Sequence, residues 1–122
     1  MKREIKFRGK SIHTNKWVYG NLRIFGERAY ISAVDSHAQS EVHLSSIGQF
    51  TGLKDKNGKE IYEGDIVSHS LHNHNYECKW FDDYACFGFE EEGMGGIYYY
   101  QSCDSRWIEV VGNIHENLEL LK

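Results

Sequence analysis

The feature that most constrains the fold of this chain is a turn-rich stretch at residues 51–67, TGLKDKNGKEIYEGDIV. Asn57-Gly58 is a strong signal for a two-residue β-hairpin, because the type I′ turn that joins such strands needs positive φ at both central residues. A second turn, Glu63-Gly64-Asp65, leads directly into the apolar pair Ile66-Val67. The segment therefore predicts backbone geometry in detail, and it contains no recognisable catalytic machinery.

Composition predicts a single, mostly β domain over residues 1–122. The chain has 122 residues, which is the size of one domain. Aromatic residues make up 14% of it, and such side chains suit a pleated, half-buried surface. With 12 glycines and no proline, positive φ values must set the turns. The N-terminal half shows no obvious core of its own, so we expect one domain.

Alternation of apolar and polar residues predicts many short strands. In the N-terminal half, it indicates strands at residues 4–8, 16–25 and 28–34. In the C-terminal half it indicates five, at residues 65–70, 76–81, 84–89, 96–101 and 107–111. Five closely spaced strands give an SH3-like pattern, and only residues 114–121 have helix-compatible spacing. We therefore expect a mainly β fold with a strongly bent sheet or small pseudo-barrel and one short helical segment near the C-terminus.

Charge and cysteine content predict a cytoplasmic protein. The net charge of −4 and the pI near 5.9 argue against a generic binder that follows nucleic-acid phosphates. No apolar run is long enough to span a membrane, and the basic N-terminus lacks the apolar core of a secretory signal. The three cysteines are odd in number and form no CxxC pair, which fits reduced thiols in a cytosol.

Three segments of the chain resemble the YopX family of phage and prophage proteins. Residues 49–67, QFTGLKDKNGKEIYEGDIV, look like the family's signature. The opening, IKFRGK at 5–10 and WVYG at 17–20, and the close, VGNIHEN at 111–117 before Leu120-Leu121, agree with it. The resemblance implies a mostly β pseudo-barrel and an origin in phages or integrated bacterial elements. It implies no activity, so no catalytic residue is carried over.

Most residues of the signature are those that a fold demands, since its glycines mark turns and its aliphatic residues enter a core. The remaining charges could meet a partner on the hairpin tip, and the candidates are Lys54, Lys56 and Lys59. The run Tyr98-Tyr99-Tyr100 must place side chains on both faces of a strand. At least one ring should then be exposed or in contact with a partner, such as a second copy of the chain.

One cluster has the residue types of a metal site, namely His69, His72, His74 and Cys78. If residues 72–74 are extended, His72 and His74 face the same way, and neutral imidazole is a good zinc ligand. The spacing matches no structural zinc motif, however, and the histidines fall in a polar separator between strands. No cofactor is expected.

Catalytic groups are not assembled in any recognisable pattern. Cys86 lies in an apolar strand, where a buried and inert thiol is expected, and Cys103 lies in a polar turn beside Asp104, whose charge would raise the pKa of the thiol. The acidic runs Asp82-Asp83 and 90–92 suit solvated turns that protect strand edges. They could also present a negative face to a basic partner. The sequence therefore predicts a protein that is not an enzyme.

A second kind of binding is suggested by the N-terminus. Lys2, Lys6, Arg8 and Lys10 alternate along one strand face, and Trp17 and Tyr19 could lie nearby. Small barrels hold single-stranded nucleic acid with basic and aromatic side chains arranged in this way. The same alternation is also what the solvent side of any strand shows.

The preferred interpretation is an uncharacterised phage or prophage accessory protein that acts without catalysis, in the cytosol of a bacterial host. It would contact a host or phage protein, and it could form a homo-oligomer. The alternative is a small β-barrel that binds nucleic acid, and a metal-binding protein comes third. No association with a membrane is expected.

Overall fold

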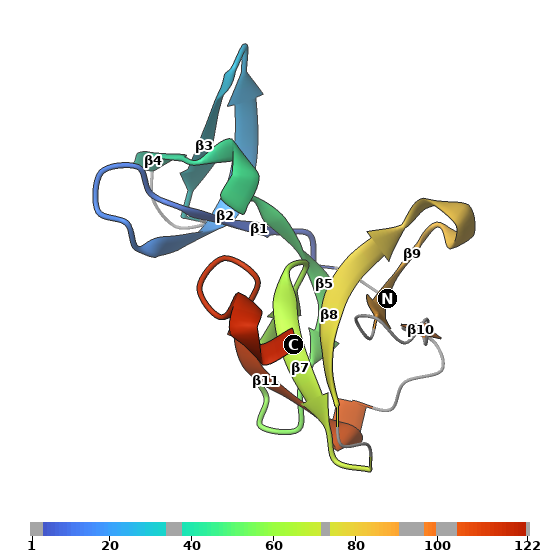
Figure 1. Cartoon of the computed structure of the whole chain (residues 1–122). Helices are drawn as coiled ribbons and strands as arrows, with labels where there is room; N and C mark the ends of the chain where they lie inside the picture. Colours follow the sequence, from blue (N-terminus) through green and yellow to red (C-terminus); the bar gives the residue numbers. More distant parts are fainter. Residues whose placement is uncertain (1–3, 34–37, 72–73, 91–96, 100–104, 122) are drawn as a thin grey trace. The chain divides into compact units, whose positions relative to one another are not determined.

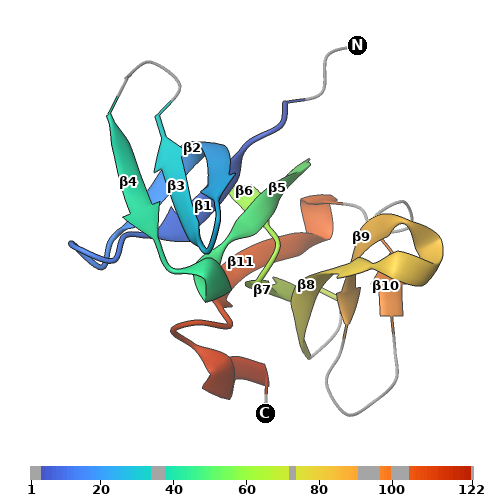
Figure 2. The ribbon, with the colours of Figure 1, turned by 90° about the horizontal axis from the view of Figure 1, so that it is seen from above.

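A computed structural model of the chain describes residues 4–33, 38–71, 74–90, 97–99 and 105–121. These residues form antiparallel strands joined by short turns, and their helical elements are 3-10 turns (Figures 1 and 2). Contacts between Cα atoms divide the chain into two compact units, residues 1–50 and 51–122. The prediction of a mainly β fold is confirmed.

The first unit contains four strands, a 3-10 turn and the start of a fifth strand. They are β1 (Phe7–Lys10), β2 (Trp17–Phe25), β3 (Arg28–Ser32), β4 (Gln39–Val42), η1 (Leu44–Ser46) and β5 (Gly48–Lys54). The strands follow the order β4-β3-β2-β1-β5, and the sheet continues to β6 (Glu60–Tyr62) of the second unit. Strand β5 thus runs across the boundary between the units.

This unit has a hydrophobic core of its own, which corrects the expectation that the N-terminal half lacks one. Ala29, Ile31 and Val42 are buried at its centre. Partly buried apolar residues pack around them, namely Phe7, Val18, Leu22 and Ile47. The core is hard to see in the sequence because each strand contributes only one or two small aliphatic side chains.

The end of β1 bends this sheet back on itself. Ser11 forms an isolated antiparallel bridge with Val42 of β4. The amide of Ile12 donates to the carbonyl of Glu41 at 3.0 Å, and the amide of His43 donates to the carbonyl of Lys10 at 2.9 Å. These bonds occupy part of the outer edge of β4, which would otherwise be open to another strand. The predicted strong bend is therefore present, although one bridge does not close the sheet into a continuous barrel.

Gly20 marks the point where β2 changes its partner. Residues 17–20 pair with β1, and residues 21–25 pair with β3. The φ angle of Gly20 is +150°, and a Cβ atom there would lie 2.0 Å from the carbonyl oxygen of Ser32. Only glycine allows β3 to approach the backbone this closely.

The second unit is built around a five-stranded antiparallel sheet of order β10-β9-β8-β7-β11. Its strands are β7 (Asp65–His69), β8 (Asn75–Phe81), β9 (Cys86–Glu90), β10 (Ile97–Tyr99) and β11 (Ile108–Asn113). The 3-10 turns are η2 (Asp82–Tyr84), η4 (Ser105–Trp107) and η5 (Leu118–Leu121). The five predicted strands are confirmed, and η5 is the predicted helical segment near the C-terminus. The last strand pairs with the first, which gives the SH3-like pattern.

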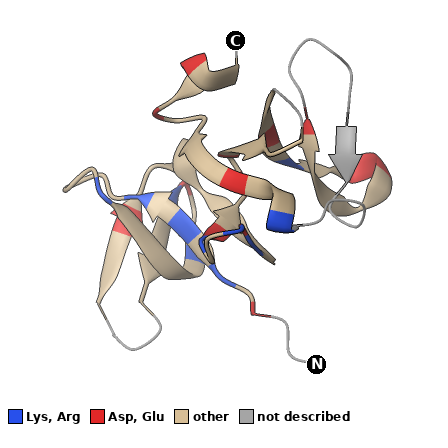
Figure 3. Cartoon of the chain, turned by 90° about the horizontal axis from the view of Figure 1, so that it is seen from below, with Lys and Arg blue, Asp and Glu red and all other residues tan. Residues whose placement is uncertain are grey.

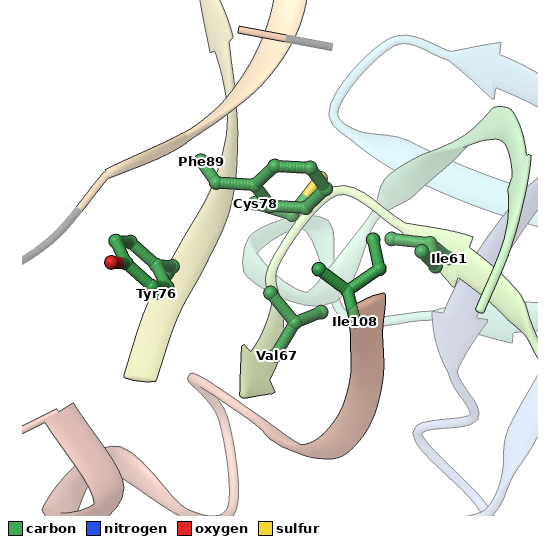
Figure 4. Packing of buried hydrophobic residues seen from close by; sticks show 6 residues of the cluster. All are labelled: Ile61, Val67, Tyr76, Cys78, Phe89 and Ile108. Carbon is green, nitrogen blue, oxygen red and sulfur yellow. The ribbon is translucent and has the colours of Figure 1, made fainter. Parts of the chain in front are cut away.

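The core of the second unit lies on one face of this sheet. Six residues of five strands pack together there, namely Ile61, Val67, Tyr76, Cys78, Phe89 and Ile108 (Figure 4). Leu53 and Val110 pack against this cluster and are partly buried. Full burial of an aliphatic or aromatic side chain contributes about 1.5–3 kcal/mol, so this cluster is a major source of the unit's stability.

The signature segment forms the predicted β5–β6 hairpin, but the predicted type I′ turn is wrong. Gly58 has a φ of +83°, whereas Asn57 does not have a positive φ. The amide of Gly58 donates to the carbonyl of Asp55 at 3.0 Å, so Lys56 and Asn57 are the central residues of the turn. A turn of this kind followed by a left-handed glycine is the longer alternative hairpin connection.

Asp55 explains this choice of turn. Its Oδ1 accepts hydrogen bonds from the amides of Asn57 and Lys59, each at 2.9 Å. Its Oδ2 accepts a third from the amide of Val110 in β11, also at 2.9 Å. The amide of Lys56 donates to the carbonyl of Ile108 at 3.0 Å. The hairpin turn is therefore fixed to β11 by one backbone hydrogen bond and one bond to the Asp55 carboxylate.

The second predicted turn, at Glu63-Gly64, leads into β7. Gly64 has a φ of +94°, a conformation that favours glycine. Its amide donates to the carbonyl of Cys78, and its carbonyl accepts from the amide of Ile114, each at 2.9 Å. Asp65 Oδ2 accepts a hydrogen bond from the amide of Tyr62 at 2.7 Å, which closes this turn with a side-chain bond.

We predict that Asp55→Asn destabilises the protein by about 1–3 kcal/mol, because an amide NH2 group cannot accept the hydrogen bond from a buried backbone N–H. Burial by itself would raise the pKa of Asp55, but the backbone donors at Val110, Lys59 and Asn57 and the charge of Lys59 outweigh it and lower the pKa. A carboxylate with a lowered pKa stabilises the fold above its unfolded pKa of about 3.9, and this stabilisation is lost as the pH falls through the lower folded pKa.

Urea unfolding of the wild type and of Asp55→Asn between pH 7 and pH 3 measures this effect. The difference in unfolding free energy should shrink towards acidic pH. Asp82→Asn, a change at an exposed aspartate, is the matched control and should behave as the wild type. A pH-independent difference for Asp55→Asn would contradict the assigned role of the charge.

A second prediction separates the core of the signature from its lysines. Ile66 is fully buried, so Ile66→Ala should cost about 2–5 kcal/mol of unfolding free energy. Lys54 and Lys59 are exposed, so Lys54→Gln and Lys59→Gln should each stay within about 0.5 kcal/mol of the wild type. Thermal unfolding followed by circular dichroism compares the three variants. Unfolding by the lysine changes would show that these side chains are part of the fold.

Candidate nucleic-acid interface

The pairing of β1 with β2 brings basic and aromatic side chains to one face of the first unit. Lys10 lies opposite Trp17, and Arg8 lies opposite Tyr19. Residues directly opposite in an antiparallel pair point to the same face, and so do residues two apart in one strand. The neighbours Phe7 and Val18 pack in the core instead. We call the set on the other face of the strands, Lys6, Arg8, Lys10, Trp17 and Tyr19, the basic–aromatic face.

Cation–π contacts hold this set together. The guanidinium carbon of Arg8 lies 4.6 Å from the ring centroid of Trp17, and Lys10 Nζ lies 5.8 Å from the same centroid. Lys6 Nζ lies 5.2 Å from the ring of Phe50. Such contacts are worth about 0.5–2 kcal/mol each, depending on solvation. Two cations therefore fix the position of Trp17.

Exposure differs across the face. Arg8 is buried and Trp17 is half-buried, which makes this pair the inner part of the face. Tyr19 is 48% exposed, so its ring can be reached by a ligand. Further along β2, Leu22 packs in the core while Arg23 and Phe25 are exposed. The side chains available to a ligand are thus cations with an aromatic ring beside them.

Two acidic side chains of this unit, Glu4 and Glu41, form ion pairs. Glu4 lies 3.6 Å from Lys6 Nζ, and Glu41 lies 3.9 Å from Arg28 Nε. The hydrogen bond that Arg28 donates to Tyr30 and the charge of Glu41 raise the pKa of Arg28, whose guanidinium stays protonated in any case. The positive charge of Lys6 on the face is therefore balanced by Glu4.

The two units carry opposite net charge. Residues 1–50 contain eight Lys and Arg against four Asp and Glu, a net charge of +4. Residues 51–122 contain six against fourteen, a net charge of −8, and the two values add to the −4 of the whole chain (Figure 3). The overall charge therefore hides a basic unit. Sequence reasoning missed this signal because it depends on where the chain divides.

The predicted metal-site residues do not form a site in the described part of the chain. Cys78 is 1% exposed in the core, whereas His74 is exposed. His69 Nδ1 accepts a hydrogen bond from the amide of Leu71 at 3.0 Å. His72 lies outside the described residues. Among the residues that are described, no three His, Cys, Asp or Glu side chains are grouped so that they could hold a metal ion. Metal binding stays a prediction.

The predicted partner-contact residues are placed as follows. Lys54, Lys56 and Lys59 are exposed, and Lys56 Nζ lies 3.6 Å from Glu109 Oε1. Tyr98 and Tyr99 belong to β10, where they pair with Phe89 and Gly88 of β9. Their side chains and all of Tyr100 lie outside the described residues. The three lysines therefore lie near a turn that is hydrogen-bonded to β11.

Comparison with known proteins now gives the family. The family model described as "YopX protein" matches residues 6–122. The chain belongs to the YopX family. Its resemblance to that family, predicted from three segments, is thereby confirmed over nearly the whole chain. No curated protein matches this YopX protein.

A solved structure of similar fold is the crystal structure of protein EF1440 from Enterococcus faecalis. It is 25% identical in sequence, with a TM-score of 0.61. The match covers 99% of this YopX chain and 100% of that chain. In the described part of the chain, no helical segment is long and apolar enough to cross a membrane. These comparisons give the family and the fold, and they carry no activity.

Proposed function

We propose that this YopX protein is a non-enzymatic binding protein whose basic–aromatic face holds single-stranded nucleic acid. The observation that carries the proposal is the stacking of Arg8 and Lys10 on Trp17 with the exposed ring of Tyr19 opposite Arg8. Cations attract the phosphates of a strand, while aromatic rings stack on unpaired bases. Both groups are present on adjacent strands of one sheet.

The net charge of the first unit supports this function, although the net charge of the whole chain is negative. A net charge of +4 on 50 residues is sufficient to attract a polyanion at short range, because ions screen charges beyond about 8 Å at physiological salt. The acidic residues of the second unit weaken this attraction only where they come within that distance. A single strand fits better than a duplex, since the bases of a duplex are not available to Tyr19 for stacking.

Contact with a host or phage protein, which the sequence favoured, remains a second proposal, and so does self-association. The family resemblance supports an origin in a phage or prophage and action in the bacterial cytosol. Both classes of binding are compatible with a protein that carries out no reaction. They differ in the residues that they use, so point variants can separate them.

The first test is the salt dependence of binding to a fluorescent dT oligonucleotide of about ten nucleotides, a length within the range that small β-barrels cover. The affinity should fall as salt rises, with a slope of log affinity against log salt of about −0.7 for each phosphate contact. Lys10→Gln should make this slope shallower by about 0.7. Lys54→Gln, which removes an exposed lysine of the second unit, is the control and should leave the slope unchanged.

The second test addresses stacking. Tyr19→Ser should weaken oligonucleotide binding by about 1–3 kcal/mol, because base–aromatic stacking has this magnitude. Tyr84→Ser removes an exposed tyrosine of the second unit and serves as the matched control. Fluorescence anisotropy measures both, and circular dichroism verifies the fold. Equal losses for the two variants, or no binding by the wild type at low salt, would overturn the proposed function.

A further inference from the structure

The β8–β9 hairpin of the second unit carries an apolar row that extends beyond the core. Tyr76, Cys78 and Trp80 alternate along β8 and therefore point to one face. Cys78 lies opposite Phe89, and Trp80 lies opposite Phe87. The exposed fraction is 2% for Tyr76 and 1% for Cys78 but 44% for Trp80. The row is thus buried in the core at Tyr76 and Cys78 and exposed to solvent at Trp80.

Aromatic side chains continue from Trp80 to the tip of the hairpin. The rings of Trp80 and Phe87 meet edge to face, with centroids 5.0 Å apart and planes at 75°. Phe87 is 8% exposed, so Trp80 covers it and is in turn open to solvent. Tyr84, in η2 between the two strands, is 62% exposed. We call Trp80, Tyr84 and Phe87 the hairpin aromatic patch.

The charges beside this patch are negative. Asp82 and Asp83 precede Tyr84 in the same turn and are both exposed. Lys79 lies next to Trp80 in sequence and therefore on the opposite face, where its Nζ is 3.4 Å from Glu90 Oε1. The hairpin belongs to the unit with a net charge of −8. A ligand of this patch would meet two carboxylates and open aromatic rings.

We infer that the hairpin aromatic patch is a docking surface for a protein segment that carries Lys or Arg together with apolar residues. The apolar side chains would cover Trp80, and the cations would pair with Asp82 and Asp83 and lie over the ring of Tyr84. A second copy of the chain docked hairpin to hairpin is disfavoured, because it would bring four carboxylates together. This inference uses residues of the second unit alone and does not depend on the proposed nucleic-acid binding.

Isothermal titration calorimetry with two short synthetic peptides tests the inference on the full chain. One peptide alternates Arg and Leu, and the other alternates Glu and Leu. The Arg-Leu peptide should bind, and the Glu-Leu peptide should not. Tyr84→Ser, and the double change Asp82→Asn with Asp83→Asn, should each weaken binding about threefold or more. Tyr19→Ser, in the first unit, should leave the affinity unchanged and is the matched control.

Three outcomes would overturn the inference. They are no binding of the Arg-Leu peptide, equal binding of both peptides, and equal effects of Tyr84→Ser and Tyr19→Ser. Self-association that Tyr84→Ser abolishes, measured by sedimentation velocity, would assign the patch to a second copy and also contradict the inference. If a dT oligonucleotide leaves peptide binding intact, the two surfaces are independent, as expected.

Discussion

Burying a carboxylate is unfavourable unless hydrogen-bond donors replace the water that it loses. Asp55 meets this condition with three backbone amides, two from its own turn and one from β11. The same carboxylate therefore shapes the β5–β6 turn and attaches it to a strand that lies more than fifty residues later in the chain. Glycines 58 and 64 allow the backbone on either side to follow this path. Several residues of the family signature thus have one task, which is to provide hydrogen bonds for a buried carboxylate.

The distribution of charge gives the two units different chemistry. In the first unit, cations and aromatic rings lie together on one face of β1 and β2. In the second, exposed aromatic rings lie beside carboxylates on the β8–β9 hairpin. The two proposed surfaces therefore suit ligands of opposite charge. The net charge of the whole chain conceals this difference, because the opposite charges of the two units partly cancel.

Local patterns in the sequence were enough to predict much of the fold, and the misses have physical causes. Alternation located β8, for example, because Tyr76 and Cys78 are buried while Glu77 and Lys79 are only partly buried. It did not reveal the core of the first unit, where Ala29, Ile31 and Val42 come together through the pairing of β3 with β4. The turn at Asn57-Gly58 was assigned the wrong type, because the decisive hydrogen bonds come from Asp55 and involve distant Val110. The alternation of Lys6, Arg8 and Lys10 was visible, but the stacking of Arg8 on Trp17 depends on strand register.

The boundary between the two units falls inside strand β5, which runs from Gly48 to Lys54. Gly48 and Gln49 pair with β1, whereas the hydroxyl of Thr51 donates to the carbonyl of Ile61 at 2.8 Å. Genes that recombine usually exchange modules at linkers, where a break leaves each module with complete strands. Here a break at the boundary would give each half an incomplete strand and an unpaired edge. The basic half and the acidic half are therefore expected to be inherited together, and surface residues can diverge far more freely than this strand.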